Sequence, residues 1–219
     1  MSSENQNKTT KVVLIGDSGV GKTCIISRFI SNEFEKELDS TDGASYGTKE
    51  LYLPKLKKKI ILDIWDTAGQ ERYKSLTKFF YKDAQIIIMV YDITQKKSFE
   101  NLKNQWYKEI QELSEKNYIL AIVGNKSDLY ETEQISEKEA REFAESINAI
   151  FELTSAQNNS GIQQLFEDVG MKYLAPDFQE KIEEEQKEKK VETNIKITKK
   201  NVKKTDEEQK TKKKKILLI

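Results

Sequence analysis

Apolar runs that alternate with helical patterns constrain the fold of this chain more than any other feature. Ile86–Val90 and Leu120–Val123 are continuous apolar runs, which is typical of central strands covered on both faces. The predicted strands are Lys11–Ile15, Ser45–Leu53, Ile60–Trp65, Gln85–Tyr91, Ile119–Gly124 and Ile150–Leu153. The predicted helices are Lys22–Ser31, Arg72–Lys78, Ser98–Glu115, Ser136–Ile147 and Ile162–Leu174. This alternation predicts an α/β fold with a mostly parallel six-stranded sheet and about five flanking helices.

One pair of neighbouring strands has no helix between its members. Only Pro54 and a lysine-rich turn separate Ser45–Leu53 from Ile60–Trp65, so this pair predicts an antiparallel hairpin at one edge of the sheet. Ser136, followed three residues later by Glu139, has the pattern of a capping box at the start of its helix.

The composition of the chain changes near Pro176. The chain has 37 basic and 37 acidic residues, but these charges are not evenly spread. Residues 177–219 carry 14 lysines and 10 acidic residues, and no aromatic residue follows Phe178. We therefore expect a disordered N-terminus (1–10), one globular domain (11–176) and a disordered tail (177–219) that is basic at its end.

The side chains that are missing exclude several kinds of chemistry. The chain has no histidine, which excludes the usual zinc sites and histidine-based proton transfer. Cys24 is the only cysteine, so no disulfide can form within the chain. Met1–Thr10 is polar, and no apolar run approaches the ~20 residues that span a membrane. We expect a protein of the cytosol.

Gly16–Thr23 has the pattern of a phosphate-binding loop, Gly-x-x-x-x-Gly-Lys-Thr, between a predicted strand and a predicted helix. Glycines let such a loop turn sharply and bring backbone N–H groups close to phosphate oxygens. The positive end of the helix dipole lies at the same place. Lys22 is then predicted to bind the β- and γ-phosphates and Thr23 to ligate Mg²⁺. The alternative is a chance glycine-rich turn.

The segment Asp66–Gln70 supplies a second group of polar residues, directly after a predicted strand. A carboxylate at this position suits the support of Mg²⁺ by Asp66. The N–H of Gly69 can approach a γ-phosphate, and the amide of Gln70 can orient an attacking water. The alternative is an ordinary loop in which the aspartate caps a helix.

The segment Asn125–Asp128 follows the next-to-last predicted strand. It predicts which base a bound nucleotide carries. An ionised Asp128 only accepts hydrogen bonds, and guanine presents two adjacent N–H donors on one edge. Adenine lacks this pair, so Asp128 disfavours an ATPase. After the last strand, Ser155 precedes Ala156, whose N–H could bind the guanine oxygen. The alternative is an ordinary polar turn.

Together and in this order, these motifs resemble those of the small GTPases of the Ras superfamily. Trp65–Tyr73 and Val90–Thr94 are similar to the Rab branch, and the resemblance runs from about Lys8 to Leu174. It implies a P-loop GTPase fold for residues 11–176, a monomer, Mg²⁺ as cofactor, slow hydrolysis of GTP to GDP, and a role in vesicle traffic. It also implies exchange factors, GTPase-activating proteins and effectors as partners, and no nucleic acid.

The resemblance also implies roles for individual residues. Gln70 would orient the attacking water, Phe34 would pack on the guanine opposite the stem of Lys126, and Thr41 in the switch I segment would sense the γ-phosphate. The implied catalytic residues are Gln70, Lys22 and Thr41, and the implied metal ligands are Thr23, Thr41 and Asp66. The implied nucleotide-binding residues are Asp17, Ser18, Gly19, Val20, Gly21, Lys22, Thr23, Cys24, Phe34, Thr41, Gly69, Asn125, Lys126, Asp128, Leu129, Ser155, Ala156 and Gln157. The implied effector-binding residues are Tyr46, Trp65 and Phe80, for which half-buried sheet aromatics are the alternative.

The chain departs from the family pattern at three places. Asp42 stands where isoleucine is usual in switch I, and Gln157 replaces a frequent lysine. In Lys212–Ile219, Ile216 occupies the place of a prenylated cysteine, so we expect weak or indirect membrane contact. This segment could attract anionic lipid, serve as a peptide ligand or have no role. A GTP-binding scaffold with negligible turnover is the competing function.

Overall fold

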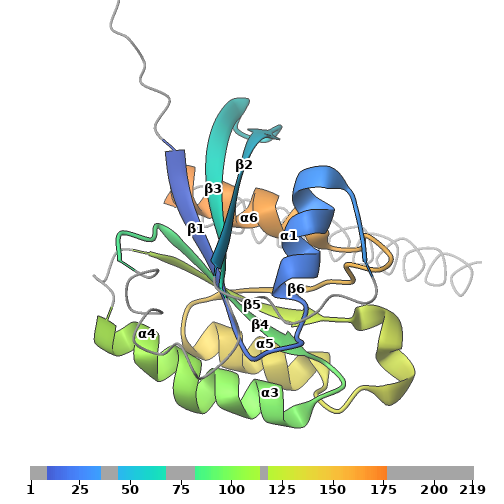
Figure 1. Ribbon diagram of the computed structural model, residues 1–219. Helices are drawn as coiled ribbons and strands as arrows, with labels where there is room; N and C mark the ends of the chain where they lie inside the picture. The colour runs from blue at the N-terminus through green and yellow to red at the C-terminus, as the bar shows by residue number, and fades with distance from the viewer. Residues whose placement is uncertain (1–8, 36–43, 68–81, 114–117, 177–219) are drawn as a thin grey trace, which may run out of the picture. The chain divides into compact units, whose positions relative to one another are not determined.

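The computed structural model describes residues 9–35, 44–67, 82–113 and 118–176 (Figure 1). The chain divides into two units, and the description below concerns the first of them, Met1–Leu174. The predicted helix Arg72–Lys78 lies outside the described residues. The predicted domain limits, including the N-terminus and the tail, stay predictions.

Six strands form one sheet in the order β2-β3-β1-β4-β5-β6. They are β1 (Thr9–Ile15), β2 (Ala44–Leu53), β3 (Lys58–Thr67), β4 (Ile86–Asp92), β5 (Ile119–Asn125) and β6 (Ile150–Leu153). Only the β2–β3 pair is antiparallel, and the other neighbours run parallel. The predicted α/β sheet with one antiparallel edge strand is therefore confirmed.

The described helices are α1 (Lys22–Ser31), α3 (Lys96–Asn101), α4 (Tyr107–Leu113), α5 (Glu137–Ser146) and α6 (Ile162–Leu174). A π-helical turn, Leu102–Trp106, joins α3 to α4 without a break, and a 3₁₀ helix covers Ser127–Thr132. The sequence pattern predicted one regular helix from Ser98, so the π-helical turn is a correction. The hydroxyl of Ser136 accepts a hydrogen bond from the N–H of Glu139 at 3.2 Å, as the capping pattern predicts.

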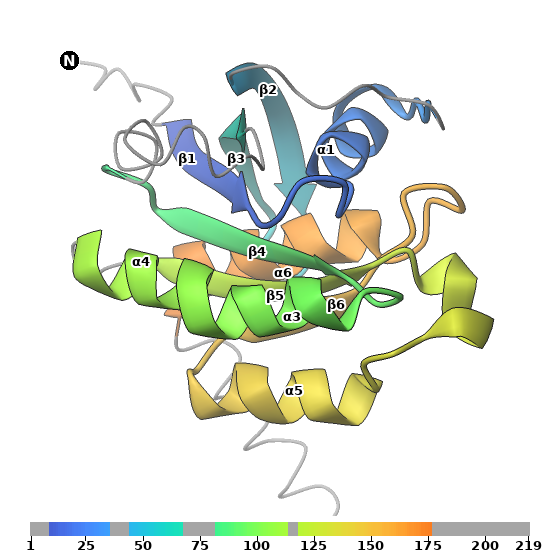
Figure 2. The ribbon, with the colours of Figure 1, turned by 60° about the horizontal axis from the view of Figure 1, so that its bottom comes forward.

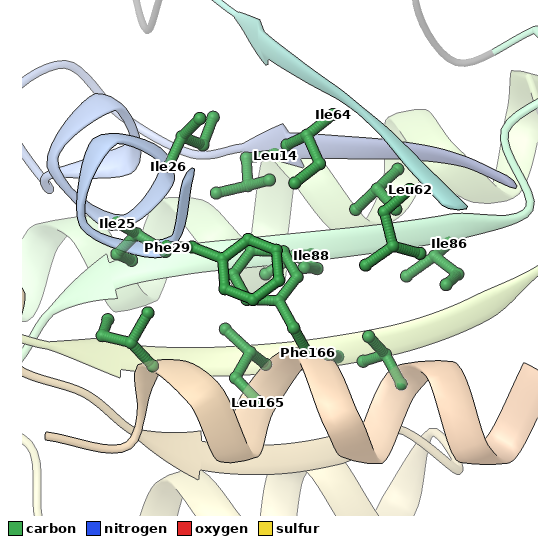
Figure 3. Close-up of a cluster of buried hydrophobic side chains, with 14 of the residues drawn as sticks. Leu14, Ile25, Ile26, Phe29, Leu62, Ile64, Ile86, Ile88, Leu165 and Phe166 are labelled. Carbon is green, nitrogen blue, oxygen red and sulfur yellow. The ribbon is translucent and has the colours of Figure 1, made fainter. Parts of the chain in front are cut away.

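Helices cover both faces of the sheet, with α1 and α6 on one side and α3, α4 and α5 on the other (Figures 1 and 2). Successive residues of a strand point to opposite faces. In β1, Val12 contributes to the core under α1 and α6, whereas Val13 contributes to the core under the other helices. Phe29 of α1 stacks on Phe166 of α6 with ring centroids 3.7 Å apart (Figure 3). The two cores hold the strand ends, and the loops that follow them, in fixed positions.

Candidate nucleotide-binding site

The loops that carry the sequence motifs all follow strand ends of one sheet. Gly16–Gly21 joins β1 to α1, Asp66 lies near the end of β3, and Asn125 ends β5. Ligands of open α/β sheets bind at the carboxyl ends of the parallel strands. The topology therefore brings motifs that are far apart in the sequence to one edge of the sheet.

Two glycines of the β1–α1 loop have no space for a side chain. Gly16 has a φ of 141°, and a Cβ added to it would lie 2.2 Å from the carbonyl oxygen of Val90. Gly21 has a φ of 94°, and an added Cβ would lie 2.3 Å from Asn125 Nδ2. Both the backbone conformation and the neighbours thus require glycine. The loop is held tightly against β4 and β5.

Lys22 is the first residue of α1 and directly follows this loop. Its Nζ donates hydrogen bonds of 2.8 Å to the carbonyl oxygens of Gly16 and Asp17, and only 5% of the residue is exposed. Burial lowers the pKa of Lys22 to about 8, although the nearby carboxylates of Asp66 and Asp17 act to raise it. A buried ammonium group that is bonded to neutral carbonyls is well suited to bind an anion such as a phosphate.

Asp66 and Thr23 form the polar pair next to this lysine. Thr23 Oγ1 donates to Asp66 Oδ2 at 2.6 Å, and Asp66 is 1% exposed. Burial raises the pKa of Asp66, while the Thr23 bond and Lys22 lower it. Among the described residues, Asp66 Oδ1 has no hydrogen-bond partner. A desolvated carboxylate oxygen beside a hydroxyl fits a hard cation such as Mg²⁺.

Thr23 and Asp66 are the described residues that offer oxygen ligands to such a cation beside Lys22. In the part of the chain that the structure describes, no three His, Cys, Asp or Glu side chains lie together as a metal-binding group. Mg²⁺ usually keeps several waters and takes one or two carboxylates together with substrate phosphates. The oxygens of Thr23 and Asp66 therefore fit Mg²⁺ that is bound jointly with a nucleotide.

Asn125 connects the β1–α1 loop to the loop after β6. Its Nδ2 donates to the carbonyl oxygen of Val20 at 2.9 Å, and its Oδ1 accepts from Thr154 Oγ1 at 3.1 Å. Asn125 is 2% exposed, so both bonds are shielded from water. The side chain acts as a clamp between the predicted phosphate-binding and base-binding loops.

Asp128 and Lys126 each have a bonded partner near the end of the sheet. Asp128 Oδ1 accepts a hydrogen bond of 2.6 Å from Ser155 Oγ, which holds the carboxylate beside the loop after β6. Lys126 Nζ lies 2.6 Å from Asp92 Oδ2, and the Asp92 side chain is 1% exposed. Asp92 Oδ1 also accepts from the Thr94 N–H and hydroxyl at 2.8 and 2.7 Å. The sequence motifs predict no role for Asp92. Its spacing to Thr94 is nevertheless typical of a turn in which an aspartate side chain bonds the N–H two residues on.

Arg28 of α1 is a second residue that sequence reasoning missed. Its Nε donates to the carbonyl oxygen of Ala156 at 2.8 Å, and its Nη2 donates to that of Gln157 at 3.3 Å. Its guanidinium carbon lies 5.7 Å from the ring centroid of Phe34. Arg28 thus joins the predicted guanine-stacking aromatic to the loop after β6. No local pattern predicts its bonds to Ala156 and Gln157, which lie 128 and 129 residues away.

The remaining predicted residues occupy varied positions. Ser18 and Gly19 are exposed, whereas Val20 is fully buried. Cys24 is half-buried, and burial raises the pKa of its thiol. Leu129 is 45% exposed. The predicted residues that lie outside the described part of the chain are Thr41, Asp42, Gly69, Gln70 and Phe80.

Two of the three predicted effector-binding aromatics lie together on the β2–β3 pair. The rings of Tyr46 and Trp65 are 5.2 Å apart, and Tyr46 is 55% exposed. Tyr46 Oη donates to Asp63 Oδ1 at 3.0 Å, and Thr48 Oγ1 donates to Tyr46 Oη at 2.7 Å. These bonds fix the orientation of the Tyr46 ring, which is exposed in the described part of the chain.

Comparison with known proteins identifies the family. The Ras family model matches residues 11–175. The chain is 42% identical to human Ras-related protein Rab-22A over 168 residues, which are 76% of this chain and 84% of the relative. It is 44% identical to GTP-binding protein ypt3 of Schizosaccharomyces pombe over 159 residues, 73% of each chain. It is 43% identical to mouse Ras-related protein Rab-31 over 159 residues, 73% of this chain and 80% of the relative. The chain therefore belongs to the Ras family, as a Rab-like small GTPase.

Proposed function

We propose that this GTPase is a switch in vesicle traffic that binds GTP and GDP with Mg²⁺ at the carboxyl ends of its strands. The observation that carries the proposal is the group formed by buried Lys22, Thr23 and Asp66 beside the β1–α1 loop. It combines a desolvated cation for phosphate with oxygen donors for a metal. The two functions that a nucleoside triphosphate with Mg²⁺ requires thus lie side by side.

The phosphates would lie in the β1–α1 loop. Lys22 would exchange its bonds to the loop carbonyls for bonds to phosphate oxygens, and Thr23 and Thr41 would ligate the metal with support from Asp66. Mg²⁺, when bound, neutralises charge on the β- and γ-phosphates. The clamp formed by Asn125 supports this arrangement, because it links the phosphate loop to the loop that would hold the base.

The base would lie between Phe34 and the stem of Lys126. The carboxylate of Asp128, held by Ser155, would accept the two guanine N–H groups, and the N–H of Ala156 would donate to the guanine oxygen. An adenine ring would leave Asp128 without donors, which is costly in a closed site. This arrangement supports selection of GTP and GDP over adenine nucleotides.

Hydrolysis would depend on Gln70 as the residue that orients the attacking water. We expect an unaided rate on the order of 10⁻⁴ s⁻¹, which the arginine of a GTPase-activating protein accelerates by up to ~10⁵-fold. Loss of the γ-phosphate would release Thr41 and the two switch segments. A chemical step would thereby change which partners bind.

The exposed ring of Tyr46, packed against the partly buried Trp65, supports effector binding by these two aromatics, with Phe80 as the third member. We expect a monomer that exchange factors and GTPase-activating proteins regulate. No helix among the described residues is both long and apolar enough to cross a bilayer. We propose action in the cytoplasm and transiently on the cytosolic face of endomembranes, with weak lipid attraction from the lysines of Asn194–Ile219.

Nucleotide selection gives the sharpest test of this function. The full-length chain is purified, and its affinity for fluorescent GDP is measured in competition with guanine, adenine and xanthine nucleotides. Asp128→Asn should shift the preference from guanine to xanthine, because an amide can donate to the extra xanthine carbonyl. Glu131→Gln, in the same 3₁₀ helix and exposed, is the matched control and should bind as the wild type does. Unchanged GDP affinity in Asp128→Asn would refute the assignment.

Turnover is measured separately as phosphate release from GTP. We expect slow multiple turnover that a candidate GTPase-activating protein accelerates, and loss of this acceleration in Gln70→Leu. Equal rates near zero in both proteins, even with activating proteins, would indicate a GTP-binding scaffold.

A further inference from the structure

The side chain of Asp17 is bonded to α3 and to the π-helical turn that follows it, far along the chain. Asp17 Oδ1 accepts a hydrogen bond of 2.8 Å from Trp106 Nε1, and Asp17 Oδ2 accepts one of 2.7 Å from Asn101 Nδ2. Trp106 is 4% exposed. Both carboxylate oxygens are therefore bonded by neutral donors of the helical segment that follows β4.

The π-helical turn explains how two donors five residues apart reach one carboxylate. In a regular α-helix, residues five apart point about 140° away from each other. Here the turn Leu102–Trp106 contains an i to i+5 hydrogen bond, in which the Tyr107 N–H donates to the Leu102 carbonyl. A wider turn brings Asn101 and Trp106 to the same side of the helix. π-helical turns within α-helices are frequent at functional sites.

Asp17 lies in the loop that is predicted to hold the phosphates, so its two bonds bear on nucleotide binding. The carbonyl of Asp17 is one of the two that bind Lys22 Nζ, at 2.8 Å, so the residue belongs to the predicted phosphate loop. A carboxylate turned toward a triphosphate would repel it, since like charges at short range cost energy in a poorly hydrated site. The bonds to Asn101 and Trp106 hold the charge on the helix side and hold the loop backbone in place.

We propose that Asn101 and Trp106 form a latch on Asp17 that slows nucleotide release. The latch is this trio of side chains, and its members are positioning residues, because they act through the shape and charge of the β1–α1 loop. The proposal rests on the proposed function, namely nucleotide binding at that loop. Its substrate class is the guanosine diphosphate or triphosphate whose phosphates the loop would hold.

The test is the dissociation rate of fluorescent GDP from the full-length chain. The fraction of protein that binds nucleotide is first measured by titration with GDP. Counting only loaded protein separates a change in release from a loss of folded material. Trp106→Phe keeps an aromatic ring and removes the N–H donor, and Asn101→Ala removes the other donor. Each should release GDP about tenfold faster or more, because each removes a hydrogen bond to a charged group. Asn104→Ala, exposed in the same π-helical turn, is the control and should release GDP at the wild-type rate.

A double-mutant cycle shows whether the effect passes through Asp17. Asp17→Ala removes the acceptor, so adding Trp106→Phe to it should change the release rate less than twofold. Acceleration by Trp106→Phe that is equally large in the Asp17→Ala background would overturn the latch. Wild-type release rates in Trp106→Phe and Asn101→Ala would also overturn it, while leaving the proposed function intact. A wild-type chain that binds no GDP would overturn both.

Discussion

Arg28→Ala offers a direct test of how the predicted base-binding loop is positioned. The substitution removes four hydrogen bonds. Three go to the carbonyl oxygens of Ala156 at 2.8 Å, Gln157 at 3.3 Å and Asn32 at 2.7 Å, and one goes to Asn32 Oδ1 at 3.4 Å. Ala156 is 3% exposed, so water reaches its carbonyl poorly once the guanidinium is gone. The Asn32 bonds are exposed and the Gln157 bond is long, so the bond to Ala156 dominates the cost.

The magnitude follows from that one bond. A hydrogen bond from a charged donor contributes about 1.5–3 kcal/mol, and a buried acceptor left without a partner costs about 1–3 kcal/mol. We take about 2 kcal/mol as the net loss. A free-energy loss of 1.4 kcal/mol corresponds to a factor of ten in affinity. If the bond to Ala156 stabilises mainly the GDP-bound state, its loss therefore weakens GDP binding by about 30-fold. Phe34 also loses the cation beside its ring, which acts in the same direction.

The assay is the equilibrium affinity for fluorescent GDP, with thermal unfolding of the nucleotide-free chain beside it. Arg28→Lys should recover only part of the affinity, because a lysine keeps the charge but cannot bridge two carbonyls as a planar guanidinium does. Lys138→Ala, on the exposed face of α5, is the control for loss of one positive charge. GDP affinity within threefold of wild type in Arg28→Ala would refute the reasoning. If Arg28→Ala lowers only the unfolding temperature and leaves the GDP affinity unchanged, Arg28 does not position the base-binding loop.

Three further predictions test the core, the β1–α1 loop and a half-buried acid. Phe166→Ala removes the ring stacked 3.7 Å from Phe29, and it should lower the free energy of unfolding by about 3–5 kcal/mol in urea titrations; a loss below about 1 kcal/mol would contradict the packing. Gly21→Ala should abolish GDP binding, because the φ of 94° is strained for alanine and the new Cβ would lie 2.3 Å from Asn125 Nδ2. GDP binding at the wild-type affinity would contradict this prediction. Burial is the main cause that raises the pKa of Glu152 above its usual value, and the carboxylate of Asp168 is the second cause. A raised pKa in the folded state means that stability is greatest below the usual pKa and is lost as pH rises through the raised value. Glu152→Gln should therefore unfold at a higher temperature than wild type at neutral pH, with the difference shrinking toward about pH 4; a difference independent of pH would refute this cause.

Local patterns in the sequence predict most of the fold. The predicted ranges of α1, α6 and β6 agree with the structure residue for residue. The other described strands begin and end within two residues of the prediction. These elements are set by short-range periodicity, by loop residues such as Pro54, and by the Ser136 cap. The π-helical turn was missed, because nothing in the spacing of apolar residues around it departs clearly from a regular helix.

The motif residues of the site could also be read from the sequence, since each lies in a short pattern that directly follows a strand. Gly16, Lys22 and Thr23 are such residues. In the structure Lys22 donates to the carbonyl oxygen of Gly16, and Thr23 donates to Asp66. Residue type and spacing predict their roles, and burial in the folded structure sets the lowered pKa of Lys22. The roles of Gln70 and Thr41 stay predictions, because both residues lie outside the described part of the chain.

The residues that hold these motifs in place emerge only from the three-dimensional contacts. Arg28 bonds to a carbonyl 128 residues away, and Asp17 bonds to side chains 84 and 89 residues away. Such pairs form because parallel strands with helical crossovers bring distant loops to one edge of the sheet. A local pattern specifies which groups a loop offers, whereas the packing of the sheet specifies which distant group lies within the roughly 3 Å that a hydrogen bond needs. The sequence therefore predicts what this protein binds, and the tertiary structure shows which distant side chains bond to the loops that are predicted to bind it.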